Sequence, residues 1–361
     1  MTTDIKMGGG IERWMVNTLN GLSGNDVAKV VGTKYYDRQR FDHVEFNGKK
    51  VQFIHIDLVE NKFVFFRKNK VLSFLLDNFL IPLVILIMKK RYIDSIGPID
   101  GPVYLTKNQY CKLFKNNIVI GSNHAEFRSD SLIDVLKAKL YSNNLIYKNI
   151  SAFHCFPGRN RINNLLATKA KIVELPNGTP DLGLPNKGDV IKFLYVGRLE
   201  RIKGIELLIE SWKMKERENC TLEIVGGGSL DVDKLVHSIP SIHFNGIVSD
   251  QKLRELFLES HYFIYPTRWD SFPMTVIEAM SASCQVITTD ILRESFKKAV
   301  ENDLINIVKP DVSSLSAAID TAIENSSRLK EKQPKIHEFF MGNYELDVIN
   351  ERLYSFIRSL Q

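Results

Sequence analysis

Short apolar runs alternate with amphipathic segments along the second half of the chain. Four runs have the length and the β-branched or aromatic content of buried strands. They cover residues 191–196, 221–225, 243–248 and 261–266. Segments with apolar residues at helical spacing follow the first and third runs, at 205–212 and 252–257. Repeated strand–loop–helix units of this kind predict a parallel sheet with helices on both faces.

The loop after the first of these strands carries two basic residues. The strand ends at Gly197, and Arg198 and Lys203 follow before the next helical segment. In an open α/β sheet, ligands bind at the carboxyl ends of the strands. Arginine offers a two-pronged donor and lysine a point charge, so the pair suits a diphosphate. Two solvated surface cations are the alternative interpretation of this pair when it is considered alone.

The fourth strand leads into 266–280, the most informative stretch of the chain. Asp270 lies in a loop, Ser271 is predicted to cap the following helix, and Glu278 lies one turn into that helix. Backbone N–H groups at a helix start can bind a phosphate. Phosphate-binding amides beside a fixed carboxylate suit a nucleotide sugar. Ordinary helix capping is the alternative for this segment by itself.

The order of these signals resembles the retaining nucleotide-sugar glycosyltransferases of family 4, which have a GT-B fold. The resemblance rests on Gly197-Arg198…Lys203-Gly204, on Asn245-Gly-Ile-Val248 and on Asp270-x7-Glu278. It is strongest over about residues 190 to 290. It implies an α/β protein with two Rossmann-like, doubly wound domains facing a cleft. The implied parts are an acceptor-binding domain (1–178), a donor-binding domain (179–344) and a carboxyl-terminal helix that crosses back to the first domain (345–361).

The resemblance also implies roles for individual residues. The implied catalytic residues are His124, Arg198, Lys203, Asp270 and Glu278. The implied donor-binding residues are Gly9, Gly10, Gly197, Gly227, Ile247, Phe272, Met274 and Thr275. Arg198 and Lys203 would neutralise the leaving diphosphate, and Glu278 would bind the ribose hydroxyls. Asp270 would hold hydroxyls of the donor sugar, although the family usually has the longer Glu at this position.

The amino-terminal half carries fewer signals. Met7–Arg13 resembles the family's Gly-Gly loop, with an ordinary glycine-rich tail as the alternative. Only Met1–Lys6 precedes it, so the first strand of this domain is predicted to be truncated. Asn117–Ala125 is a predicted strand that carries His124 near its end, and in the resembled family such a histidine lies beside the donor sugar and the acceptor. A structural role is the alternative for His124, and His154 is assigned no role.

Composition bears on cofactors and location. The four cysteines include no C-x-x-C pair, which argues against a zinc site or a disulfide framework and for a reducing compartment. No signal peptide is visible, so a cytoplasmic location is expected. Asp231-Val-Asp233 has the D-x-D pattern of a metal site, but it opens a predicted helix, where acidic residues are favoured. No metal or other cofactor is expected.

The charge is distributed unevenly. Residues 1–178 hold 26 Lys/Arg and 15 Asp/Glu, whereas residues 179–361 hold 22 and 27. The apolar run Phe79–Met88 precedes Lys89-Lys-Arg91, and it is too short to span a bilayer, which needs about 20 residues. A buried helix is the preferred interpretation, and a surface that docks on the anionic inner membrane leaflet is the alternative. Without aromatic interleaving or a known module, the basic charge does not favour a nucleic-acid partner.

The predicted function is transfer of a hexose from a nucleotide-diphosphate sugar to a hydroxyl of a glycan or lipid-linked acceptor. Such a reaction would serve the synthesis of cell-surface polysaccharide, glycolipid or glycoprotein glycan. Retention of anomeric configuration is implied by the resemblance. The sequence nominates no carboxylate for double displacement, so attack from the leaving-group face is favoured. A non-catalytic partner subunit, and an epimerase or phosphorylase on the same scaffold, stay open as alternatives.

Overall fold

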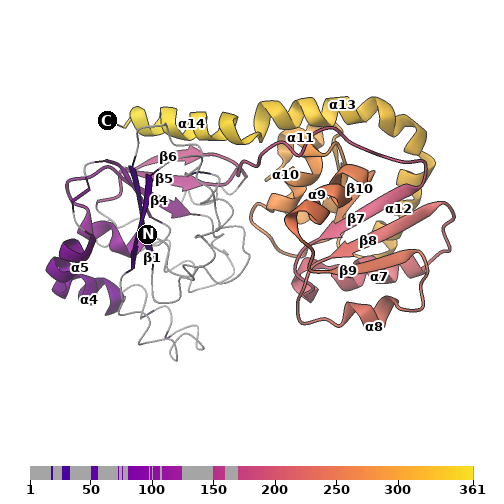
Figure 1. The fold of residues 1–361 in the computed structure, drawn as a ribbon, viewed down its shortest axis with the longest axis horizontal. Coiled ribbons are helices and arrows are strands. Elements are labelled where there is room, and N and C mark those ends of the chain that lie inside the picture. Colours follow the sequence, from indigo (N-terminus) through magenta and orange to yellow (C-terminus); the bar gives the residue numbers. More distant parts are fainter. Residues whose placement is uncertain are drawn as a thin grey trace. The chain divides into compact units, whose positions relative to one another are not determined.

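The computed structural model describes residues 170–360 throughout and parts of the chain before them. The earlier parts are 27–32, 50–55, 80–96, 98–99, 101–105, 108–123 and 149–158, with the single residues Thr18, Leu72 and Leu75. The chain divides into two compact units (Figure 1). Unit 1 comprises Met1–Pro176 and Asn350–Gln361, and unit 2 comprises Asn177–Ile349. The last helix, α14 (Leu346–Arg358), begins in unit 2 and ends in unit 1.

Unit 2 is built on a six-stranded parallel sheet. Its strands are β7 (Ile191–Val196), β8 (Cys220–Val225), β9 (Ile242–Gly246), β10 (Tyr262–Tyr265), β11 (Gln285–Thr289) and β12 (Ile305–Val308). Their order in the sheet is β12-β11-β10-β7-β8-β9, and every pair is parallel. This is the strand order of dinucleotide-binding folds, and it reverses between β7 and β10. The predicted fold class, α/β with parallel sheets, is therefore confirmed.

Helices connect the strands of unit 2 and cover its sheet. They are α7 (Ile205–Lys213), α8 (Val232–Val236), α9 (Asp250–Glu259), α10 (Met274–Ser281), α11 (Lys297–Glu301), α12 (Val312–Glu324) and α13 (Ser326–Asn343), with 3₁₀ turns η5 (Arg201–Lys203) and η6 (Asp290–Leu292). Both faces of the central strands are apolar because helices pack on both sides. Phe193 on β7 stacks on Tyr262 of β10 with 4.9 Å between ring centroids and meets Trp212 of α7 edge-on.

Unit 1 contains a four-stranded parallel sheet of order β3-β4-β5-β6 and a parallel pair, β1-β2. The strands are β1 (Val27–Gly32), β2 (Lys50–His55), β3 (Val103–Leu105), β4 (Val119–Asn123), β5 (Ala152–Cys155) and β6 (Lys171–Glu174). The strands predicted around β4 and β5 are confirmed. The predicted truncation at Met1–Lys6, the glycine-rich segment Met7–Arg13 and the end of the β4 segment at His124 lie outside the described residues.

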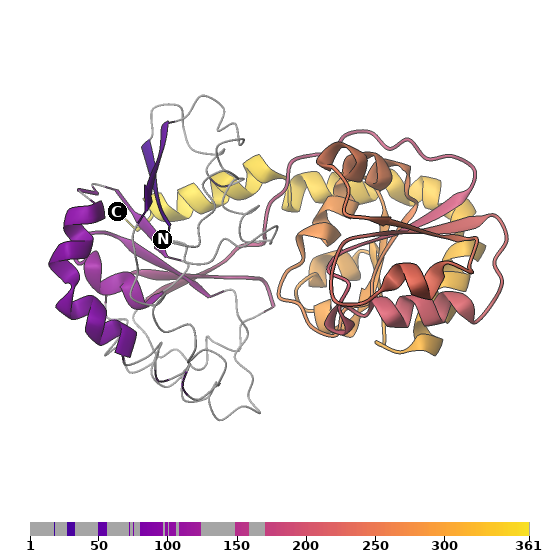
Figure 2. The ribbon, with the colours of Figure 1, turned by 60° about the horizontal axis from the view of Figure 1, so that its bottom comes forward.

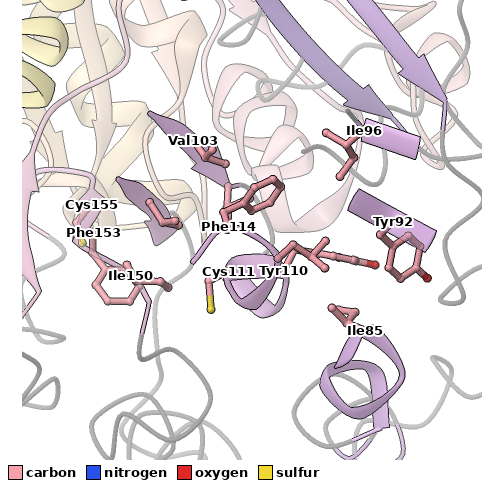
Figure 3. Close-up of a cluster of buried hydrophobic side chains, with 13 residues drawn as sticks. Ile85, Tyr92, Ile96, Val103, Tyr110, Cys111, Phe114, Ile150, Phe153 and Cys155 are labelled. Carbon is pink, nitrogen blue, oxygen red and sulfur yellow. The ribbon is translucent and has the colours of Figure 1, made fainter. Parts of the chain in front are cut away.

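A hydrophobic core joins the helices of unit 1 to its sheet. Helices α4 (Ile81–Ile87) and α5 (Lys89–Ile96) and the 3₁₀ turn η3 (Asn108–Leu113) pack on one side of that core. In Figure 3, Ile85 and Tyr92 point from α4 and α5 toward Tyr110. The predicted burial of the apolar run holds for one face only, because Leu83 and Ile87 on α4 are 54% and 73% exposed. Among the described helices, none combines the length and apolarity needed to cross a bilayer.

His154 on β5 is a buried structural residue. Its Nε2 lies 3.0 Å from the carbonyl oxygen of Leu175, and its Nδ1 lies 2.6 Å from the Tyr104 hydroxyl. A neutral ring that donates from Nε2 and accepts at Nδ1 satisfies both contacts. Burial lowers the pKa of His154 to about 4, which keeps the ring neutral.

Acidification is expected to destabilise the fold through His154 and His261. Burial is the main cause that lowers the pKa of each to about 4, whereas histidine in an unfolded chain has a pKa of about 6.5. Between these values the unfolded state binds more protons, so stability rises with pH and is lost as the pH falls from about 6.5 toward 4. Thermal unfolding measured across this window should therefore show a Tm that drops on acidification.

A matched pair of variants tests whether buried histidines cause this pH dependence of Tm. His261→Asn removes one of the two groups and should flatten the pH dependence of Tm, whereas His237→Asn changes an exposed ring and should leave it unaltered. A Tm that stays constant or rises as the pH falls through this window would contradict the assignment.

Candidate active site in unit 2

Two loops meet at the point where the strand order of unit 2 reverses. The loop 197–204 follows β7, and the loop 266–273 follows β10, the strand paired with β7. The carboxyl ends of adjacent parallel strands lie at one edge of a sheet, and the crevice at such a reversal is where these folds bind ligands. The two segments singled out from the sequence are therefore neighbours.

Close backbone contacts fix the two loops against each other. Gly204 has φ +72°, and a Cβ atom there would lie 1.9 Å from the carbonyl oxygen of Pro266. The Arg268 N–H donates to the carbonyl oxygen of Ile202 at 2.9 Å. The Arg268 guanidinium also pairs with Glu206 on α7 at 2.5 Å. The loops are thus held together before any ligand is present.

Lys203 places a buried positive charge between these loops. Only 6% of the residue is exposed. Its Nζ lies 2.6 Å from Oδ2 of Asp270 and donates to the carbonyl oxygen of Trp269 at 3.2 Å. The same ammonium lies 5.9 Å from the centre of the Tyr265 ring. Removing a charge from water costs free energy unless the charge is paired. The ion pair with Asp270 offsets this cost for the buried ammonium of Lys203.

Asp270 is itself oriented by the protein. The Tyr265 hydroxyl donates to Oδ2 at 2.7 Å, and the backbone N–H of Ser271 donates to Oδ1 at 2.7 Å. Burial, reinforced by the neighbouring Asp270 charge, raises the pKa of Tyr265 well above its usual value, so the phenol keeps its proton and stays a donor. In this geometry the Asp270 carboxylate holds the Lys203 ammonium in place through the ion pair. Its contact with a donor sugar stays a prediction.

Helix α10 begins directly after this loop. Pro273 occupies its N-cap position with φ −71° and ψ 125°, and no side chain caps the helix. The prediction that Ser271 caps it is wrong, because the helix starts at Met274, two residues too far along for a cap at Ser271. The N–H groups of Met274 and Thr275, its first two residues, have no partner within the helix by geometry, whereas the Val276 N–H donates to the carbonyl oxygen of Pro273 at 3.3 Å. The first two N–H groups form a surface suited to an anion.

Two further predicted residues lie on or beside α10. Glu278 is one turn into the helix and only 4% exposed. Phe272 precedes the helix, and its ring is buried and stacked on Phe296 with 4.6 Å between centroids. The backbone of Phe272, rather than its ring, is therefore the group that a ligand could meet. The amide of Asn177 donates to the carbonyl oxygen of Phe272 at 3.1 Å and fixes this backbone.

Glycines bring the ends of β7, β8 and β9 together. Gly226 has φ +144°, and a Cβ there would lie 1.9 Å from the carbonyl oxygen of Gly197. A Cβ at Gly227 would lie 2.9 Å from Cδ1 of Ile247, which is 85% exposed. The structure thus places Gly227 and Ile247, both predicted to bind the donor, in contact. Together they offer a partly exposed surface of backbone and apolar side chain.

Arg198 lies at the exposed side of the loop 197–204. Its Nη1 is 2.8 Å from both carboxylate oxygens of Glu200, and 62% of its side chain is exposed. Exposed pairs of this kind contribute little stability, so a stronger anion could replace Glu200 at small cost. The remaining predicted site residues, Gly9, Gly10 and His124, lie outside the described residues.

Sequence reasoning missed Tyr265 and Asn177. Tyr265 ends an apolar run that was interpreted as a buried strand, and the signal that could have identified it is a hydroxyl at the strand end, five residues before Asp270. Asn177 lies beside the predicted domain boundary at 178/179, and no motif gave it a role. Its role as an anchor for Phe272 depends on a contact across 95 residues, which no local pattern encodes.

Metal ligands do not gather in the described part of the chain. No group of three His, Cys, Asp or Glu side chains there could hold a metal ion. Asp231 of the D-x-D pattern is the N-cap of α8 and accepts from the Lys234 N–H, and Asp233 lies in the first turn. The explanation of these two residues as helix-start acids is confirmed. Independence from metal stays a prediction.

Comparison with known proteins gives a match to one family. Residues 183–338 match the family model described as Glycosyl transferases group 1. An uncharacterized glycosyltransferase of Methanocaldococcus jannaschii, MJ1607, is 29% identical over 163 residues, which cover 43% of this chain and 39% of that protein. O-antigen chain mannosyltransferase B of Escherichia coli is 25% identical over 143 residues, 37% of each chain. The chain thus spans about two fifths of the length of these relatives.

A solved structure extends the likeness to the whole chain. The structure of Anabaena Alr3699/HepE in complex with UDP and glucose has a TM-score of 0.69, with 99% of this chain and 98% of that chain covered. Sequence identity is 14%, so this likeness shows the fold, GT-B, and nothing finer. Together with the family match, it supports a place in the glycosyltransferase superfamily.

Gly204→Ala is expected to destabilise unit 2 by about 2–4 kcal/mol, because the left-handed backbone and the contact with Pro266 both exclude a Cβ. The matched control is Gly188→Ala, since a Cβ at Gly188 meets nothing within 4 Å and its φ is not in the left-handed region. That change should shift the free energy of unfolding by less than about 0.5 kcal/mol. Urea unfolding of both variants measures this, and equal effects would contradict the account of the two loops.

Tyr265→Phe is expected to cost about 1.5–3 kcal/mol, because it removes a hydrogen bond to the ionised Asp270. Tyr262→Phe is the matched control, since that hydroxyl donates to the neutral carbonyl oxygen of Ala322 and should cost about 1 kcal/mol. Urea unfolding of both variants should therefore show the larger loss of stability in Tyr265→Phe. Equal losses in the two variants would contradict the role of the Tyr265 hydroxyl in orienting Asp270.

Proposed function

We propose that the chain is a glycosyltransferase that moves a hexose from a nucleotide-diphosphate sugar to an acceptor hydroxyl, with retention of anomeric configuration. The observation that carries this proposal is the buried ammonium of Lys203, held by Asp270 of the loop that leads into α10. A fixed cation and the N–H groups at a helix start both suit a diphosphate. The match to Glycosyl transferases group 1 covers the same segment.

The described residues supply a place for each part of a nucleotide sugar. Lys203 and the first-turn amides of α10 would bind the diphosphate, with Arg198 closing from the exposed side. Glu278 would accept hydrogen bonds from the ribose hydroxyls. Gly227 and Ile247 would border the base. The donor sugar would then lie near Asp270, whose carboxylate already holds Lys203 and so links the recognition of the sugar to that of the phosphate.

Electrostatic preorganisation would supply the catalysis. The leaving diphosphate gains charge as the glycosidic bond breaks, and cations and amides already in place stabilise that charge without reorganisation. Lys203 fits this role because its position is fixed by the contacts with Asp270 and Trp269. The acceptor would attack from the face of the leaving group, with the diphosphate as base. Lys203 provides positive charge for this step without a bound metal.

The acceptor class is proposed from the relatives. One relative is by name a mannosyltransferase of an O-antigen chain, and a structure with the same fold was solved with UDP and glucose. Both favour a hexose donor, and the name of the first alone favours a glycan or lipid-linked acceptor of the cell surface. We place the reaction on the cytoplasmic side.

Binding and slow hydrolysis of a panel of UDP-, GDP- and ADP-sugars would test the function. One donor should bind selectively, and Lys203→Met and Glu278→Gln should each weaken binding at least about tenfold, since each removes one charged contact. Lys192→Met is the matched control, because Lys192 lies at the start of β7 and pairs with Glu259 instead.

Two results would contradict the proposal. If no donor binds, the site assignment is wrong. If a donor binds in the way described but is neither hydrolysed nor transferred to any glycan or lipid-linked acceptor, the non-catalytic partner subunit becomes the better description. Conversion of the donor into its epimer would instead identify the protein as a sugar-nucleotide epimerase.

A further inference from the structure

The exposed apolar side chains of unit 1 are concentrated in one short segment. Among its described residues, the large apolar side chains with high exposure all lie between 72 and 93. They are Leu72, Leu75, Leu80, Leu83, Ile87 and Ile93. Helices α4 and α5, which carry or adjoin four of them, lie beside one another on the outside of this unit in Figures 1 and 2. An exposed apolar patch on a globular unit marks an interaction surface.

Helical spacing separates this segment into two faces. Hydrogen bonds from Met88 N to Val84 O and from Tyr92 N to Met88 O carry the helical pattern from α4 into α5. Ile85, Tyr92 and Ile96 follow one face and are buried in the core of unit 1. Leu80, Leu83 and Ile87 follow another face at spacings of three and four, and they are exposed. We refer to these three side chains as the apolar stripe.

The apolar stripe continues into basic residues. Lys90 and Arg91 lie three and four residues beyond Ile87, so they extend the same side of the helical segment. Lys89 precedes them, and Asp94 is the one acidic residue of α5. With Ile87 and Met88, the side chains of Lys90, Arg91 and Asp94 line an open hollow with a volume of about 640 Å³. An apolar stripe therefore runs into a hollow with two cations and one carboxylate.

We infer that the apolar stripe and the hollow beside it dock on a bilayer surface that contains anionic lipids. Apolar side chains of an interfacial helix enter the boundary between headgroups and acyl chains, while neighbouring basic residues meet anionic headgroups. The charge of the segment favours this partner over a second copy of the same surface, since two such faces would bring like charges together. Residues 1–178 also contain more Lys and Arg than Asp and Glu, so their net charge is positive as well.

This inference is independent of the proposed reaction. It concerns residues of unit 1, whereas the donor site proposed above consists of residues of unit 2. Binding to vesicles can therefore be measured without nucleotide, and a protein that binds lipid but not donor would refute only the function. Docking would also explain why an α4 with one face in the core keeps three large apolar side chains in water.

Flotation of the full-length protein with lipid vesicles tests the inference. The protein should float with vesicles of phosphatidylcholine and phosphatidylglycerol at low ionic strength, and much less with phosphatidylcholine alone. Leu83→Ser combined with Ile87→Ser should weaken binding at least about tenfold. Lys90→Gln combined with Arg91→Gln should weaken it about 25-fold, at about fivefold for each basic side chain.

Matched controls come from unit 2. Leu184→Ser changes an apolar side chain that is 85% exposed but lies outside the stripe, and Lys330→Gln with Lys335→Gln removes two exposed charges from α13. Both controls should float like the unaltered protein. Circular dichroism of every variant confirms that it is folded.

The inference is overturned if the unaltered protein fails to float with anionic vesicles at low ionic strength, or if it floats equally with neutral ones. It is also overturned if the stripe and hollow variants bind as well as the controls. A change from dimer to monomer in the stripe variants, measured by sedimentation, would assign the surface to a second copy of the chain instead.

Discussion

The ion pair between Lys203 and Asp270 is the contact on which the candidate site depends. It joins the loop after β7 to the loop after β10 at 2.6 Å, where the strand order of unit 2 reverses. Breaking a buried pair by removing one partner costs about 3–5 kcal/mol in general, because the other charge is left in a medium that solvates it poorly. The pair is therefore a constraint on both loops and a source of fixed positive charge.

Other features of unit 2 make this pair possible. Gly204 allows the two loops to approach within contact of their backbones, and Tyr265 and the Ser271 N–H orient the carboxylate. The same loop leads into α10, whose start is not covered by a capping side chain. Under the proposed function, stability and ligand recognition share the same groups, so a change at either loop is expected to affect both.

Local sequence patterns predicted the parallel α/β architecture of unit 2 and its first four strands, because buried strands, glycine turns and helical spacing are short-range signals. They did not single out β11 and β12, which complete the six-stranded sheet. They identified Lys203 and Asp270 separately, but not as partners, since the pair joins residues 67 positions apart. The cap at Ser271 was predicted wrongly because Ser and Pro273 both favour helix starts, and only the backbone shows which position the helix uses. For the run 79–88, apolar residues on all sides could not reveal which face of α4 is exposed. Tyr265 was missed for a similar reason. A tyrosine at the end of an apolar run looks the same in the sequence whether only its ring is buried or its hydroxyl also orients a carboxylate.

The most direct test is a crystal structure of the protein with UDP bound. The account predicts that the diphosphate contacts Nζ of Lys203 and the backbone N–H groups of Met274 and Thr275, with the ribose hydroxyls on Glu278. Lys203 should keep its contact with Asp270, because the carboxylate holds the ammonium in place for the ligand. A diphosphate bound away from Lys203 and from the start of α10 would contradict the central claim.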